Sequence, residues 1–257
     1  MNSSAMLPAR FTTTALLVAE ALLVTIPFFV LGSVFNFPDI LREPAQAVFT
    51  LFSAHQSTIV FNYYLFLLSS IAYAPLSYFL VKTYRENTST HLQHLLIGAG
   101  LATMIFQTLG FVRWIFFMPW LSHTYLANPG QRETVSLIYE TMNRYAGMSV
   151  GEHLGFIAMG SWVFVLALML WQSKKLPAIV SYSGMAIGAM LIVSVGEQFG
   201  GQAAPLFGLL NLLANTAWTF WMFALAGFTF LHKTNINWVV SAGVHERQKV
   251  MLKNVSR

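Results

Sequence analysis

Two short stretches of the chain resemble each other, and each carries one carboxylate. Residues 149–155 read Ser-Val-Gly-Glu-His-Leu-Gly, and residues 194–200 read Ser-Val-Gly-Glu-Gln-Phe-Gly. Each stretch lies at one end of a long apolar run, so Glu152 and Glu197 stand where a hydrophobic segment meets a polar one. Ionisable side chains in such places are costly to bury, and they usually mark a functional site.

Arg113 is the cation that the sequence predicts at the level of the two carboxylates. It lies inside the apolar run 95–121, about 10 Å before Trp120 at 1.5 Å per helical residue. We predict that Arg113 lies between the two acids, in a layer of polar side chains that also holds His153, Gln198 and Asn62. Two acids beside one cation favour binding or movement of a small polar or cationic ligand, an ion or a proton. The alternative is a structural or accessory subunit in which the charges only clamp helices together.

Three histidines support a second hypothesis, a membrane enzyme or redox subunit with a His-ligated metal or haem. His55, His123 and His153 are predicted on the same side of the membrane, and imidazole is a common ligand of metals and of haem iron. The three are scattered along the chain and form no recognised ligand motif. No cofactor is therefore predicted, metal or haem stays an alternative, and catalytic residues remain unassigned.

The composition identifies the environment in which these side chains must lie. Hydrophobic residues make up 56% of the 257 residues and charged residues only 9%, whereas soluble domains carry about 25% charged residues. The chain is therefore an integral membrane protein whose first partner is the lipid bilayer. The net charge of +5 is explained by membrane orientation. The sequence has no basic cluster that would predict nucleic-acid binding. With no cysteine, disulfides and thiolate metal sites are excluded.

Six apolar segments are each long enough to cross a bilayer, which takes about 20 helical residues. We predict spans over residues 14–36, 57–81, 95–121, 148–171, 177–200 and 206–231. Two outer interfacial helices are expected as well, one after Pro44 and one over residues 131–146. The predicted fold is an all-α polytopic bundle over residues 1–232, followed by a basic tail, 233–257. Glu20, in the first span, falls in the inner half and outside the charged layer.

Lysine and arginine predict the orientation of this bundle. Ten of the 14 such residues lie in the N-terminal segment, the second and fourth connections and the tail, and three lie in the other connections. Because cytoplasmic loops are enriched in Lys and Arg, both termini are predicted to be cytoplasmic and the charged layer to face outward.

Glycines at a spacing of four predict close packing of the fourth and fifth spans. Gly147, Gly151 and Gly155 repeat in one, and the other carries Gly184, Gly188, Gly196 and Gly200. Small residues at this spacing let helix backbones approach closely. We expect Gly151 and Gly196 to lie in that contact.

Several stretches together resemble a known family. They are residues 37–44 (Phe-Pro-Asp-Ile-Leu-Arg-Glu-Pro), residues 107–114 (Gln-Thr-Leu-Gly-Phe-Val-Arg-Trp), the stretch with Asn143, Tyr145 and Gly147 leading into 151–155, and the last span with Asn211, Trp218, Trp221 and Gly227. The chain is similar here to a bacterial family of multi-pass membrane proteins, domain of unknown function 4386. The resemblance implies a six-helix bundle in a bacterial cytoplasmic membrane, and it implies no activity and no functional residues.

Overall fold

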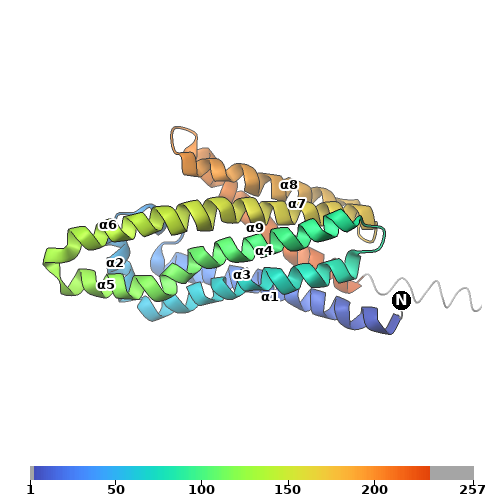
Figure 1. The fold of residues 1–257 in the computed structure, drawn as a ribbon, viewed down its shortest axis with the longest axis horizontal. Coiled ribbons are helices and arrows are strands. Elements are labelled where there is room, and N and C mark those ends of the chain that lie inside the picture. Colours follow the sequence, from blue (N-terminus) through green and yellow to red (C-terminus); the bar gives the residue numbers. More distant parts are fainter. Residues whose placement is uncertain (1–2, 232–257) are drawn as a thin grey trace, which may run out of the picture.

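The computed structural model describes residues 3–231, and within this range the chain is helical with no β-strand (Figure 1). Six helical runs are long and apolar enough to cross a membrane: Ala9–Phe35, Gln56–Tyr84, Thr90–Ala127, Pro129–Ser173, Ala178–Phe199 and Ala204–Leu231. The predicted all-α, six-span fold is thus confirmed. The predicted basic tail, 233–257, lies outside the described residues.

The described chain is built from α-helices and from shorter segments with tighter or wider turns. The α-helices are α1 (Ser3–Phe35), α2 (Ala45–Ala54), α3 (Gln56–Tyr84), α4 (Thr90–Val112), α5 (Met118–Ala127), α6 (Arg132–Met142), α7 (Gly155–Ser173), α8 (Ala178–Ser194) and α9 (Ala204–Leu231). The 3₁₀ segments are η1 (Asp39–Arg42), η3 (Pro129–Gln131) and η5 (Val195–Phe199), and the π-helical ones are η2 (Arg113–Phe117) and η4 (Asn143–Leu154).

Two of the runs are much longer than a bilayer is thick. Thr90–Ala127 has 38 residues and Pro129–Ser173 has 45, so each exceeds about 50 Å, against about 30 Å of hydrocarbon. Their excess forms the α5–α6 hairpin at one end of the molecule, beside α2, while the N-terminus lies at the other end (Figure 1). We call these the α2 end and the N-terminal end. Of the two outer helices predicted, α2 is a separate helix, whereas α6 continues without a loop through η4 into α7.

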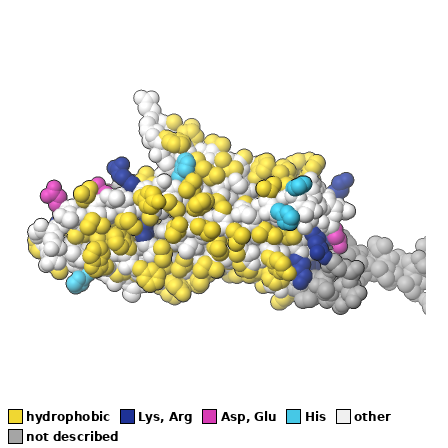
Figure 2. Space-filling view, in the orientation of Figure 1, with side chains coloured by type: hydrophobic (Ala, Val, Ile, Leu, Met, Phe, Trp, Pro, Cys, Tyr) yellow, Lys and Arg dark blue, Asp and Glu magenta, His cyan; other side chains and the backbone are white. Residues whose placement is uncertain are grey.

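Hydrophobic side chains cover the middle of the molecule, and charged side chains gather toward its two ends (Figure 2). Large apolar residues within the spans stay exposed, for example Phe29, Ile105 and Phe220. Such exposure is costly in water and favourable against lipid. The pattern agrees with a bundle that spans a membrane along its long axis.

Two hydrophobic cores hold the bundle together. The first joins α1, α3, α7, α8 and α9 around Trp162, Trp218 and Leu166. The second lies at the α2 end, where Tyr63 stacks on Trp114 with ring centroids 4.8 Å apart. There α2 inserts Phe49 against Tyr125 and Tyr139 of the hairpin, at 4.8 and 5.3 Å. The α5–α6 hairpin is therefore packed onto the rest of the α2 end.

Glycines bring α7 and α8 together, as predicted for the fourth and fifth spans, but of the two glycines in contact only Gly188 was among those predicted. A Cβ on Gly160 would lie 2.7 Å from the Gly188 carbonyl oxygen, and the reverse distance is also 2.7 Å. Gly151 instead faces Gly110 of α4, where a Cβ would lie 2.9 Å from the Gly110 Cα, and Gly196 faces the ring of Phe207. The expectation that Gly151 and Gly196 join the fourth and fifth spans is wrong, because both face away from that contact.

The Gly160–Gly188 contact leads to a packing prediction. Gly160→Leu or Gly188→Leu should lower the stability of the folded protein in detergent by about 1–3 kcal/mol, because the added side chain must push the α7 and α8 backbones apart. Thermal unfolding followed by circular dichroism measures the loss. Gly227→Leu is the matched control, since a Cβ there meets nothing within 4 Å. Equal losses in all three variants would contradict the close α7–α8 contact.

Candidate functional site

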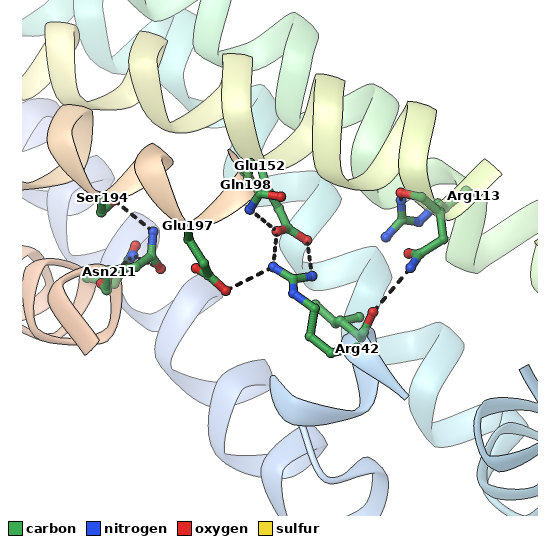
Figure 3. A network of polar contacts seen from close by, with 10 residues as sticks. Arg42, Arg113, Glu152, Ser194, Glu197, Gln198 and Asn211 are labelled. Atoms are coloured by element: carbon green, nitrogen blue, oxygen red, sulfur yellow. Dashed lines mark hydrogen bonds and ion pairs between the residues drawn. The ribbon is translucent and has the colours of Figure 1, made fainter. Parts of the chain in front are cut away.

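Three segments from distant parts of the sequence meet at the α2 end and bring together two carboxylates and one guanidinium. Arg42 closes η1, Glu152 lies in η4, and Glu197 lies in η5 (Figure 3). The Arg42 Nη2 lies 2.6 Å from Glu152 Oε2 and 3.2 Å from Glu197 Oε1, and Nη1 lies 3.3 Å from Glu152 Oε1. Glu152 is therefore held by both nitrogens of the fork, and Glu197 by one.

Gln198 completes this cluster, which we call the Arg42 cluster: Arg42, Glu152, Glu197 and Gln198. The Gln198 Nε2 donates to Glu152 Oε2 at 2.8 Å, while its buried Oε1 has no partner among the described residues. The side chains of Arg42, Glu152 and Glu197 are 39%, 17% and 27% exposed. Burial alone would lower the pKa of Arg42, but hydrogen bonds to the carboxylates and their charges raise it overall.

Arg113 was predicted between the two acids, and the structure places Arg42 there instead. The Arg113 Nη1 donates to the Asn143 carbonyl oxygen at 3.4 Å, and its guanidinium lies 5.5 Å from the Trp114 ring. Among the described residues, no carboxylate forms an ion pair with it. The reason is local: the guanidinium lies against Gly147, in the space that a Cβ would fill.

The surroundings of Arg113 are polar and only partly satisfied. Arg113 is 8% exposed, and the hydroxyls of Tyr63 and Tyr139 and the Oδ1 of Asn143 are buried without a partner in the described part of the chain. The Asn143 Nδ2 donates to the Leu41 carbonyl oxygen at 3.1 Å. Asn143 thus connects the Arg113 surroundings to the segment that carries Arg42.

Both arginine environments involve π-helical turns. Arg113 begins η2, and η4 spans the 12 residues from Asn143 to Leu154, including Glu152 and His153. The segments approach closely because Gly110 and Gly151 have no side chains: a Cβ on Gly110 would lie 2.8 Å from the Gly151 Cα. π-Helical segments are rare, and single-turn ones such as η2 occur frequently at functional sites.

The other predicted site residues lie outside the Arg42 cluster or at its edge. His153 packs its ring edge-on against Phe199, with centroids 5.5 Å apart. Asn62 is buried and donates to the Thr58 carbonyl oxygen of its own helix at 2.8 Å. His55 and His123 are exposed at the α2 end. In the described range, no three His, Cys, Asp or Glu side chains are grouped so that they could hold a metal ion.

Two further features of the chain involve side chains that can take part in catalysis. Residues 147–151 read Gly-Met-Ser-Val-Gly, but Ser149 lies inside the continuous helix η4 and not on the strand-to-helix turn of a nucleophile elbow. His91 and His94 line a mostly apolar cavity of about 470 Å³ between α4 and α7, near the N-terminal end. Neither pattern lies in the Arg42 cluster.

Comparison with known proteins identifies the family. Residues 12–226 match the family described as Domain of unknown function (DUF4386). The chain belongs to this family. All residues of the Arg42 cluster, together with Glu20 and Arg113, lie inside the DUF4386 range. No curated protein and no solved structure matches the chain.

Arg42 is the member of the cluster in this DUF4386 protein that sequence reasoning missed. It lies in the short connection 36–44, seven residues after α1 ends at Phe35. A connection this short keeps its one arginine close to the ends of the spans. Only three Lys or Arg residues lie in the connections at the α2 end, and this scarcity was the feature of the sequence that could have pointed to Arg42.

The ion pairs predict which arginine stabilises the fold. Arg42→Met should destabilise the protein by about 1–3 kcal/mol, between the values for exposed and buried pairs, because it leaves two carboxylates without a counter-ion. Arg42→Met combined with Glu152→Gln and Glu197→Gln should recover most of that loss. Chemical or thermal unfolding in detergent measures both differences.

Arg113→Met is the control for this series. It leaves no carboxylate without its ion-pair partner, so its unfolding free energy should fall by less than that of Arg42→Met. If Arg113→Met were the more damaging change, and were rescued by the two glutamine substitutions, Arg113 would be the functional counter-ion of the acids.

Proposed function

We propose that this membrane protein binds a small organic cation or polar amine at the Arg42 cluster. The observation that carries the proposal is that two carboxylates share one guanidinium at a partly exposed position. The three charges sum to −1 when both acids are ionised. A second positive charge would therefore be favourable at this position, provided that it can reach the carboxylates.

Glu197 is the acid that we expect to receive the ligand. It has one contact with Arg42, at 3.2 Å, whereas Glu152 has two, the shorter at 2.6 Å. Gly208 leaves space beside it, since a Cβ there would lie 3.4 Å from the Glu197 Cδ. In this proposal a ligand ammonium group competes with Arg42 for Glu197, while Glu152 keeps Arg42 in place. The unpartnered Oε1 of Gln198 is a further acceptor for the ligand.

We further propose the setting of the site. The resemblance to the DUF4386 family suggests a bacterial cytoplasmic membrane. The charge asymmetry of the connections favours an orientation with both termini in the cytoplasm and the Arg42 cluster on the outer side. Ligand binding there is compatible with a receptor or with one step of transport. A helix clamp without a ligand is the second candidate, and it is favoured by the same ion pairs.

A binding experiment separates the ligand site from the clamp. Putrescine, choline and methylammonium serve as probes on purified full-length protein, each compared with sodium chloride at the same ionic strength. At a concentration about 100-fold above the dissociation constant, a bound probe should stabilise the protein by about 2.7 kcal/mol. Glu197→Gln should abolish this increase, and Arg42→Met should leave it or strengthen it because the competing cation is gone.

In this test, the stabilisation by each probe is compared with the stabilisation by sodium chloride. If no probe stabilises the wild type more than sodium chloride does, the cluster is a clamp for helices and the binding proposal fails. Glu133→Gln is the matched control, because this acid lies at the start of α6 and is exposed outside the cluster. It should change the response to no probe.

Orientation is tested separately. A reporter that works only in the cytoplasm should be active when it is fused after residue 231. A cysteine introduced at exposed Gly130 in the α5–α6 hairpin should react with an impermeant maleimide from outside intact cells. The opposite pattern would place the Arg42 cluster on the cytoplasmic side.

A further inference from the structure

Glu20 is a carboxyl group in the middle of the first span that the Arg42 cluster does not involve. It is 0% exposed, and neither carboxyl oxygen has a hydrogen-bond partner among the described residues. It lies 11 residues after Ala9 and 15 before Phe35 in the apolar run, about 16 and 22 Å from the ends. Both ends of the span are therefore distant from this acid.

The helices around Glu20 offer it no counter-ion. α1 packs against α3 and α9. On α3, Tyr73 interacts electrostatically with Glu20, and its own buried hydroxyl has no described partner. α9 contains no Asp, Glu, Lys, Arg, His or Tyr, and the buried Trp218 Nε1 is another donor without a described partner. Glu20 thus lies in an apolar core that contains two unused donors.

A carboxylate without a counter-ion is strongly disfavoured in such surroundings, and the neutral acid is accepted far more readily. We propose that Glu20 is a proton-binding site inside the membrane, reached from the α2 end along polar side chains of α9. The proposal is independent of the ligand proposed for the Arg42 cluster, because it rests on a different residue and on different contacts.

Polar side chains on α9 mark the route. Glu197 lies beside Gly208, and one turn further along α9 the Asn211 Nδ2 donates to Ser194 Oγ at 3.0 Å (Figure 3). One more turn on, the Asn215 Nδ2 donates to the Asn211 Oδ1 at 3.0 Å. The next residue on this face is Trp218. These polar side chains thus form a line that leads from the Arg42 cluster into the bundle.

Interhelical hydrogen bonds show where Glu20 lies along the bundle axis relative to these polar side chains of α9. The hydroxyls of Thr13 and Thr83 are 2.9 Å apart, and those of Tyr84 and Thr229 are 2.6 Å apart, so these residues of α1, α3 and α9 lie at one level. From that level, at 1.5 Å per residue, Glu20 lies about 10 Å further toward the α2 end, Tyr73 about 15 Å and Trp218 about 16 Å. Along the bundle axis, both unused donors therefore lie at levels between those of Asn215 and Glu20.

Infrared spectroscopy of the full-length protein in lipid tests the protonation of Glu20. At mildly alkaline pH, the wild-type minus Glu20→Gln difference spectrum should contain the carbonyl band of a protonated carboxyl. A carboxylate band in its place would overturn the proposal. Should Glu20→Gln not fold, Glu20→Leu replaces it, and both samples are recorded at the same lipid-to-protein ratio so that the ester carbonyl absorbance of the lipid cancels in the difference.

Transfer into heavy water tests the route. The band should shift as the proton is replaced by a deuteron, and Asn211→Leu or Asn215→Leu should slow this exchange about tenfold. Thr216→Leu on the exposed face of α9 is the matched control and should leave the rate unchanged. A band that never exchanges in the folded protein would overturn access to the site, and equal rates in all variants would overturn the α9 route. Glu20→Gln should still bind any probe that the Arg42 cluster binds.

Discussion

The hydrocarbon around the spans is the constraint on which the rest of this structure depends. It requires that backbone polar groups be paired within each helix, and it moves charged side chains toward the two ends of the bundle. Some of the polar side chains that remain inside pair across helices: the Trp162 Nε1 donates to Ser77 Oγ, and the Trp221 Nε1 donates to the Val180 carbonyl oxygen, each at 2.8 Å. Against this pattern, a buried acid or guanidinium without a charged partner is conspicuous.

The spans could be predicted from the sequence because hydropathy directly reports contact with lipid. Predicted and observed limits differ by a few residues at most ends, for example 57–81 against Gln56–Tyr84. The long run Pro129–Ser173 is the exception. The polar composition of residues 131–146 suggested a separate surface helix, since hydropathy cannot distinguish a helix lying on the membrane from one that continues above it.

The charged residues show what the sequence could not determine. Depth along a helix follows from counting residues, and this correctly placed Glu152 and Glu197 at one level. The direction of a side chain around the helix depends on the turn, and the wide turns of η2 and η4 change that direction at Arg113 and Glu152. Arg42 lies in a connection whose path is determined by tertiary contacts, such as the bond from Asn143 to Leu41. The glycine spacing likewise predicted the close approach of the fourth and fifth spans, but not that Gly151 would face α4 and Gly196 would face Phe207.

The uninterrupted helix from Pro129 to Ser173 has a mechanical consequence. This rod has no loop inside it, but it contains the π-helical turns of η4, and such turns are one of the places where helices bend. Glu152 is carried on this rod, whereas Arg42 and Glu197 belong to other segments. Because Glu152 lies in η4, a change of the bend there would alter the separation between Glu152 and Arg42.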